Sequence, residues 1–137
     1  MDGISEILAT YNCVSLDEKI QFELDGVVEK EIKQAYCIEN LEFCVSCMDY
    51  TTLKVSDTEE SVKNFTADLL KKLKKFNLRD VAAVCVFSNY AGIVREGLKG
   101  TEIQTAVVAG NFPNSQTFTE IKLAECKMAI GAGAQEV

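Results

Sequence analysis

Hydrophobic and polar positions along the chain switch between the two periods that distinguish strands from helices. Six nearly uninterrupted apolar residues from Val81 to Val86 are too few for a helix of ordinary length and are rich in valine, which predicts a strand buried on both faces. Immediately afterwards, Ala91, Val94 and Leu98 recur at helical spacing. Because a strand that leads straight into a helix is half of a βαβ unit, the pattern predicts a parallel sheet covered by helices.

Similar units flank this central one. Residues 43–50 (FCVSCMDY) are predicted to form the first strand, and Ser56 with Glu59 is expected to open the following helix as a capping box. The inner face of that helix is expected to carry Val62, Phe65, Leu69, Leu73 and Phe76. Residues 102–109 are predicted to form a third strand.

A further helix is predicted over residues 116–130, and residues 134–137 are predicted to open a fourth strand. This helix is expected to bury Phe118, Ile121, Ala124 and Met128. Three strand–helix units and the start of a fourth strand are about half of an eight-stranded barrel, which takes ~200 residues or more. We therefore expect the chain, with its 137 residues, to be too short to close one.

The region before the first predicted strand has a helical pattern over residues 3–36. Ser15 and Glu18 predict a helix start within it, and Gly26 predicts an interruption or kink. We therefore interpret residues 1–42 as a helical N-terminal extension and residues 43–137 as the partial barrel.

Composition limits the partners and the compartment. The net charge of −7, from 21 acidic and 14 basic residues, argues against nucleic acid as a partner, because neutralising phosphates requires a basic face. The N-terminus carries no basic leader before an apolar run, and no stretch approaches the ~20 apolar residues of a membrane span. We expect a cytoplasmic protein with no membrane partner, whose six cysteines are mostly reduced.

Asp49 is the first candidate for chemistry. It ends an apolar segment at the carboxyl end of a predicted strand, where parallel α/β folds place functional groups, and Thr51 lies on the same strand face. A carboxylate among Cys47, Met48 and Tyr50 would need a partner or would have a shifted pKa. The alternative is an aspartate that caps the next turn, and position alone leaves both open.

Other motifs favour structural interpretations. Cys44 and Cys47 form CxxC, but the chain has no histidine and no second such pair, so we expect no metal site. The basic run over residues 71–75 is interpreted as a solvated helix end, and the loop over residues 111–116 as a capping segment rather than an anion site. Without histidine, covalent catalysis would require a lysine in an apolar pocket, and all 12 lysines occupy polar positions in the pattern.

Four blocks, in this order, carry a family resemblance: CMDYTTLKVSDTEESV, VAAVCVF, TAVVAGNFP and EIKLAECKMAIGAGAQEV. Together they resemble the N-terminal half of deoxyribose-phosphate aldolase over residues 47–137. The resemblance implies a (β/α)8 barrel that reversibly cleaves 2-deoxy-D-ribose 5-phosphate to glyceraldehyde 3-phosphate and acetaldehyde through a lysine Schiff base, without a metal or other cofactor. By matching motifs, it implies that the substrate-pocket residues are Asp49, Thr51, Cys85 and Phe112.

The resemblance also has departures. Ser88 and Asn89 stand where the family commonly has Pro-Arg, and Asn114 stands where it commonly has histidine. In the family, the catalytic aspartate would come directly after Val137 and both catalytic lysines still later, so we expect the chain as given to be inactive alone. The alternatives are a non-catalytic half-barrel that self-associates or pairs with a C-terminal half, and a small α/β sheet that binds a ligand by itself.

Overall fold

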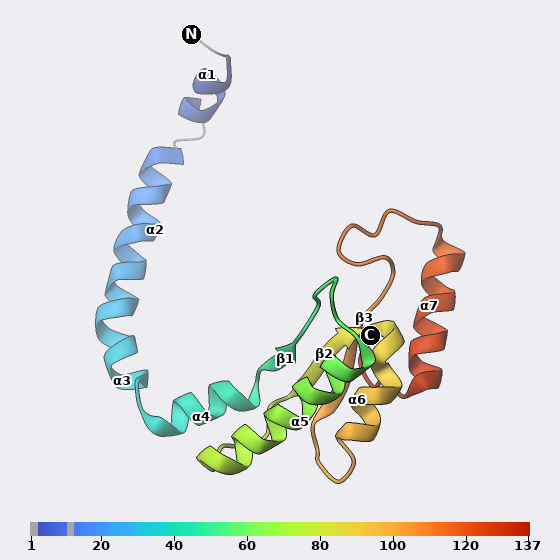
Figure 1. Ribbon diagram of the computed structural model, residues 1–137. Helices are drawn as coiled ribbons and strands as arrows, with labels where there is room; N and C mark the ends of the chain where they lie inside the picture. Colours follow the sequence, from blue (N-terminus) through green and yellow to red (C-terminus); the bar gives the residue numbers. More distant parts are fainter. Residues whose placement is uncertain (1–2, 11–12) are drawn as a thin grey trace. The chain divides into compact units, whose positions relative to one another are not determined.

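The computed structural model describes residues 3–10 and 13–137 of the chain (Figure 1). It divides into two compact units, Met1–Leu41 and Glu42–Val137. Within the described ranges, no helix is both long enough and apolar enough to cross a membrane.

The first unit is helical, as the pattern predicted. It contains α1 (Gly3–Thr10), α2 (Cys13–Val27), the π-helical segment η1 (Val28–Ile32) and α3 (Lys33–Ala35). The regular α-helix ends one residue after Gly26, which confirms the predicted interruption. The predicted capping box at Ser15 is wrong, because α2 already begins at Cys13 and Ser15 lies inside the helix.

The predicted first strand over residues 43–50 is wrong for most of its length. Residues 43–46 complete helix α4 (Ile38–Ser46), and strand β1 covers just Asp49–Thr51. Strand alternation would place Phe43 and Val45 on the same face, but Phe43 is 60% exposed while Val45 packs against the core of the second unit, so alternation does not describe this segment. Cys44 and Cys47 therefore lie at a helix end, where the Cys47 amide donates to the Cys44 carbonyl over 3.1 Å.

The second unit is built on a three-stranded parallel sheet in the order β1-β2-β3, with β2 at Ala83–Phe87 and β3 at Gln104–Val108. Its helices are α5 (Glu59–Phe76), the 3-10 turn η2 (Ser88–Tyr90), α6 (Ala91–Gly97) and α7 (Thr119–Ala132). The predicted fourth strand begins at its expected place, where Glu136 forms a parallel bridge with Ala106. The chain thus alternates strand and helix, as predicted.

Helix α5 begins two residues later than expected. The Thr58 hydroxyl accepts from the Ser61 amide over 3.1 Å, and the Ser61 hydroxyl accepts from the Thr58 amide over 2.8 Å, which forms a reciprocal capping box. Ser56 lies in the turn before this cap, so the predicted pair of Ser56 and Glu59 is wrong. Both pairs have the same spacing. The Asp57 carboxylate, directly before the later cap, accepts from the Thr52 hydroxyl and the Lys54 amide, each over 2.9 Å, which holds the turn that contains Ser56.

The core lies between the sheet and the helices that cover its outer face. Val84 and Val86 on β2 and Val107 on β3 are buried there. The helical side chains that pack against them include Val62, Leu69 and Leu73 of α5, Ala91 and Val94 of α6, and the adjoining Leu98. The predicted central strand and the apolar faces of its neighbouring helices are therefore confirmed, except that Phe76 at the end of α5 is 61% exposed.

Helix α7 differs from its prediction. Phe118, just before the helix, and Ile121 and Met128 within it are exposed, and the buried member of the helix is Ala129. In the described part of the chain α7 contacts η2 and α6. The predicted buried face is therefore wrong, because the small side chain of Ala129 faces the core while the larger apolar side chains face away from it.

Candidate functional site

The predicted pocket residues Thr51 and Cys85 lie side by side across the sheet. The parallel register pairs Thr51 of β1 with Cys85 of β2, and pairs Cys85 with Ala106 of β3, which in turn pairs with Glu136. Paired residues in neighbouring strands project from the same face of a sheet. This face is opposite to the one that carries Val84 and Val86, so it is not the face that α5 and α6 cover.

Asp49 belongs to the same polar group. It lies two residues before Thr51 on β1, so its side chain shares that face, and the Thr51 hydroxyl donates to the Asp49 carbonyl over 3.1 Å. Burial raises the pKa of the Cys85 thiol, the charge of Asp49 raises it further, a hydrogen bond with Thr51 lowers it, and Glu136 adds a smaller increase. Cys85 therefore stays protonated at neutral pH and is a neutral group on this face of the sheet.

Glu136 is a member of this group that the sequence reasoning missed. The prediction of a strand over residues 134–137 contained the signal, because a fourth parallel strand places alternate residues on the inner face. The bridge to Ala106 brings Glu136 into the row that contains Cys85. Together with Asp49, which lies on the same sheet face but pairs with Ala83, the row gives this face two carboxylates, a hydroxyl and a thiol, which can donate to or accept from a small polar molecule.

Phe112 is not joined to this group. It lies in the segment between β3 and α7, its ring is 50% exposed, and it precedes a cis peptide bond to Pro113. Within residues 3–10 and 13–137, no hydrogen bond or aromatic contact connects Phe112 to Asp49, Thr51 or Cys85. Its role in the pocket remains a prediction.

A second polar cluster lies at the ends of β2 and β3, around Glu125 of α7. One carboxylate oxygen accepts from the Ser88 hydroxyl over 2.8 Å, and the other accepts from the Gly110 and Asn111 amides over 2.9 and 3.3 Å. The hydrogen bond from Ser88 lowers the pKa of Glu125, and the two amide hydrogen bonds lower it further. Burial raises this pKa, but the net shift is downward. Sequence reasoning missed this residue, because an acidic residue beside an apolar helix face has the pattern of an ordinary helix.

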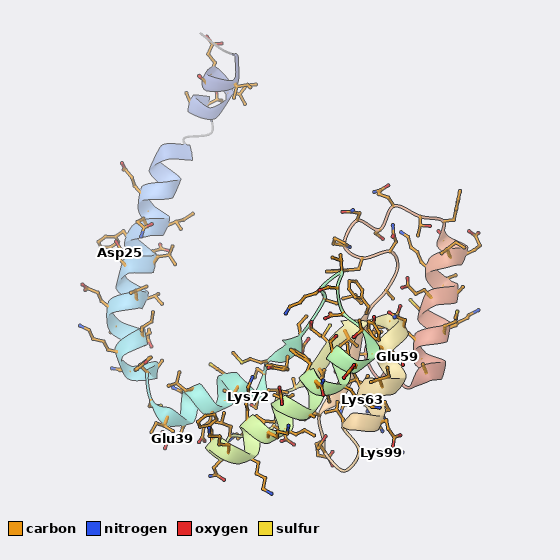
Figure 2. The ribbon with its side chains drawn as sticks, in the orientation of Figure 1. Asp25, Glu39, Glu59, Lys63, Lys72 and Lys99 are labelled. Carbon is orange, nitrogen blue, oxygen red and sulfur yellow. The ribbon has the colours of Figure 1, made fainter. Side chains whose placement is uncertain are left out.

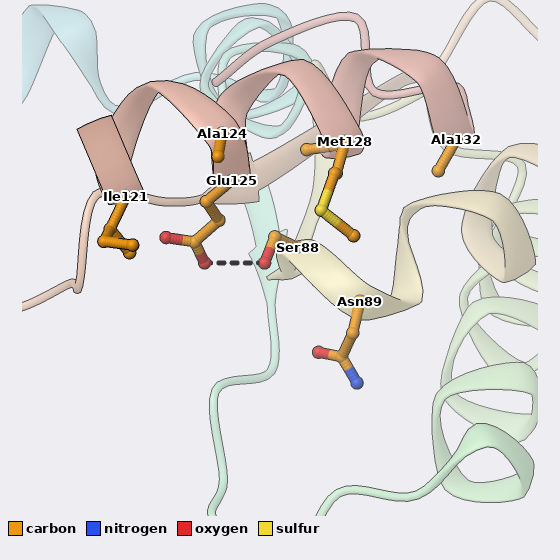
Figure 3. Close-up of a pocket in the computed structure, with 8 residues that line it drawn as sticks. Ser88, Asn89, Ile121, Ala124, Glu125, Met128 and Ala132 are labelled. Atoms are coloured by element: carbon orange, nitrogen blue, oxygen red, sulfur yellow. Dashed lines mark hydrogen bonds between the residues drawn. The ribbon is translucent and has the colours of Figure 1, made fainter. Parts of the chain in front are cut away.

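An open apolar groove of about 600 Å³ lies next to Glu125, between α7 and η2 (Figure 3). Ile121 and Met128 line it from α7, and Ser88 and Asn89 line it from η2. Neither Thr51 nor Cys85 lines this groove, so it is distinct from the row across the sheet.

No lysine in this chain has the environment that imine chemistry requires. Eleven of the twelve lysines are exposed, among them Lys63, Lys72 and Lys99 (Figure 2). The twelfth, Lys122, is partly buried and donates to the Ser115 hydroxyl over 2.8 Å. An amine becomes nucleophilic at neutral pH when it is desolvated or lies beside another cation, whereas eleven of these amines are exposed and that of Lys122 donates to a hydroxyl. The described residues also contain no cluster of three potential metal ligands.

Comparison with known proteins agrees with this geometry. The deoxyribose-phosphate aldolase of Clostridium novyi is 42% identical over 90 residues, which are 66% of this chain and 37% of that protein. The enzyme of the same name from Bos taurus is 33% identical over 131 residues, which cover 85% of this chain and 39% of that protein. The predicted resemblance to deoxyribose-phosphate aldolase is confirmed. No family model matches the chain.

Solved aldolase structures show the same fold relationship. A proposed deoxyribose-phosphate aldolase from Coccidioides immitis superposes with a TM-score of 0.58 at 26% identity, over 69% of this chain and 34% of that one. The tetrameric deoxyribose phosphate aldolase of Aeropyrum pernix gives a TM-score of 0.53 at 26% identity, over 68% of this chain and 36% of that one. The parallel sheet and its helices are therefore part of an α/β barrel, and the chain spans less than two-fifths of its curated relatives' length.

Proposed function

We propose that this chain supplies the first three strand–helix units of a deoxyribose-phosphate aldolase barrel and, with them, one wall of the substrate pocket. The observation that carries the proposal is the row of Thr51 and Cys85 across β1 and β2, in a segment up to 42% identical to named aldolases. The proposed reaction is the reversible cleavage of 2-deoxy-D-ribose 5-phosphate to glyceraldehyde 3-phosphate and acetaldehyde. Asp49 and Phe112 are the other proposed members of this wall.

In this proposal the wall residues bind and orient the sugar phosphate. The Thr51 hydroxyl can donate to or accept from a sugar hydroxyl, and the Asp49 carboxylate can accept from one. Cys85, protonated because burial raises its pKa, presents a small, weakly polar surface to the carbon chain. In this proposal the imine-forming lysine is assigned to later strands of the barrel, and the residues of β1 and β2 bind and orient the substrate.

The first test asks whether the isolated chain forms an imine. Acetaldehyde condenses with a reactive lysine to form a Schiff base with loss of water, and borohydride reduces that imine to an ethylamine. Intact-mass spectrometry detects the added ethyl group. We expect no stable site-specific adduct on the 137-residue chain, since eleven of its twelve lysines are exposed and Lys122 is hydrogen-bonded to Ser115. The aldolase of Clostridium novyi serves as the positive control. A stoichiometric adduct on one lysine, together with cleavage of deoxyribose 5-phosphate, would contradict the proposal that this chain binds the substrate but does not supply the imine-forming lysine.

A second candidate function is a non-catalytic assembly module, which one specific observation favours. Asp49 and Thr51 on β1 are exposed, and among the described residues β1 pairs with β2 alone, so one sheet edge is open there. Open edges and uncovered sheet faces promote association with a second chain. We propose self-association or pairing with a complementary C-terminal half, and the tetrameric relative supports a homo-oligomer. Sedimentation of a concentration-independent monomer would count against this module.

We also propose a cytoplasmic location. Cys37, Cys44, Cys47, Cys85 and Cys126 are free thiols in the structure. Persistent free thiols are typical of a reducing compartment. Fractionation of expressing cells, followed by thiol labelling before and after reduction, tests this placement. Recovery in a membrane fraction would contradict a cytoplasmic location, and so would thiols that react with the label only after reduction.

A further inference from the structure

The Glu125 carboxylate joins three segments that are distant in sequence. It projects from α7, and one of its oxygens accepts from Ser88, directly after β2 (Figure 3). The other oxygen accepts from Gly110 and Asn111, shortly after β3. The three donor–acceptor distances are 2.8, 2.9 and 3.3 Å. One side chain therefore ties the carboxyl ends of two neighbouring strands to one helix.

The two amides come from an unusual stretch of backbone. Gly110 and Asn111 both have positive φ angles, 68° and 62°, and successive left-handed residues direct their N–H groups toward one carboxylate oxygen. Asparagine tolerates this region, but it is not the preferred one for a residue with a side chain. Hydrogen bonds to a charged acceptor are stronger than neutral ones and stabilise this turn.

The Gly110–Asn111 turn and Ser88 are each close in sequence to a proposed pocket residue. Phe112 follows Asn111 directly, and Ser88 lies three residues after Cys85, beyond the end of β2. A shift of the Gly110–Asn111 turn would therefore displace Phe112, and a shift of Ser88 would displace the end of the strand that carries Cys85. Glu125 itself does not belong to the row across the sheet.

We propose that Glu125 is a positioning residue, which fixes the loops after β2 and β3 and so sets the place of Phe112 relative to Cys85. The inference rests on the proposed function for the meaning of that wall, and deepens it by adding a residue that acts without touching the substrate. Mutation of such a residue alters substrate-pocket geometry while the proposed contact side chains remain intact.

The first experiment detects the carboxylate–amide bonds in the intact chain by NMR. The Gly110 and Asn111 amide proton signals are followed as the pH is lowered. In the wild type we expect both signals to titrate together, below the ordinary range for glutamate, because hydrogen bonding to Ser88 and the amides lowers the pKa of Glu125. In Glu125→Gln the titration should vanish, and in Glu120→Gln, a control at an exposed acid of the same helix, it should persist. Signals that do not titrate in the wild type would overturn the proposal, even if the Gln variant failed to fold.

The second experiment tests positioning. Glu125→Gln replaces a charged acceptor with a neutral one, so amide exchange at Gly110 and Asn111 should accelerate at least about threefold in this variant. Alkylation of Cys85, resolved from Cys126 by peptide mass, should accelerate at least about threefold as the β2 end loosens. Glu125→Asp, which keeps the charge, should recover part of the exchange protection. Faster exchange with unchanged Cys85 alkylation would show a loop contact that positions nothing, and would overturn the inference.

Neither measurement requires aldolase turnover. Failure of the Glu125 inference would therefore leave the aldolase proposal intact, and failure of the aldolase proposal would leave the amide titration unchanged.

Discussion

Helices α5 and α7 have similar patterns of apolar residues in the sequence, but those side chains are buried on α5 and exposed on α7. Helix α5 buries Val62, Leu69 and Leu73 against the sheet, as its apolar stripe predicts. Helix α7 also carries apolar residues at helical spacing, but Ile121 is 57% exposed and Met128 is 76% exposed. The two helices show that periodicity identifies an apolar face without identifying what covers it.

The difference follows from the sheet. Helix α5 packs on a part of the sheet where β1 and β2 are paired strands. Helix α7 follows β3, and next to β3 the described residues form a single bridge, between Ala106 and Glu136, instead of a further strand. In the described part of the chain, α7 is held through Ala129, its contacts with η2 and α6, and the hydrogen bonds of Glu125. Variants on the two helices should therefore have very different effects.

The largest difference is expected for truncation of a leucine or isoleucine. Leu69→Ala should lower the free energy of unfolding by ~2–5 kcal/mol, because it leaves a cavity in the core. Ile121→Ala should change it by less than ~1 kcal/mol, because that side chain is already exposed. Urea unfolding followed by circular dichroism measures both. Equal losses at the two sites would mean that α7 is covered as fully as α5.

The helix ends give the next test. Gly133, which terminates α7, has φ of 112°, and an added Cβ would lie 3.0 Å from Cγ of Arg95. Gly133→Ala should therefore destabilise the chain by ~1–2 kcal/mol. Gly131, within α7, has open space around it, so Gly131→Ala should stabilise by up to ~1 kcal/mol. Thermal melts of the pair compare the two sites directly, and the same sign of change at both would contradict the assigned end of α7.

Helix starts differ as well. Thr58 caps α5 through its side chain, whereas Phe118 gives α7 no side-chain cap. Thr58→Ala should cost ~1 kcal/mol, while Ser56→Ala should leave stability nearly unchanged. Phe118→Asp should stabilise α7 by a similar or smaller amount. A larger loss for Ser56→Ala than for Thr58→Ala would restore the cap position that the sequence pattern first suggested.

The smallest effect is a pH-dependent one on α7. Hydrogen bonds from Ser88 and the loop amides lower the pKa of Glu125 in the folded state, so the folded state binds its proton less readily than the unfolded state. The contribution of this carboxylate to stability is therefore present above its unfolded pKa and is lost as the pH falls through the folded pKa. The stability gap between wild type and Glu125→Gln should be present at neutral pH and disappear in acid. A gap that is independent of pH would show that the charge of Glu125 is unimportant.

Sequence reasoning was most reliable where local pattern and burial agree. The run from Val81 to Val86 predicted β2 because a buried parallel strand is apolar on both faces, and Ala91 and Val94 predicted α6 by their spacing. It failed at residues 43–46, where a short apolar segment has no decisive period, and at the cap of α5, where two equivalent capping pairs overlap. In both places the outcome goes with contacts that the pattern does not contain: Val45 packs against the core, and Asp57 accepts from Thr52 and Lys54 just before the later cap.

The candidate site was predictable where it depends on local strand alternation, and not where it depends on the pairing of separate segments. Asp49 and Thr51 share a strand face by the period of two, so their proximity was predictable, but the register that places Thr51 beside Cys85 required the sheet. Glu125 could not be found from pattern, because its hydrogen-bond partners come from two separate loops. The role of Phe112 stays a prediction from resemblance.

The most direct measurement of the central claim is complementation. The 137-residue chain is mixed with a polypeptide that carries the remaining strands of the Clostridium novyi aldolase, and acetaldehyde release from deoxyribose 5-phosphate is assayed. We expect no activity from either chain alone, activity from the mixture, and a marked loss when Thr51→Val replaces the wild type. A complex that assembles and binds no substrate, or turnover by this chain alone, would contradict the account.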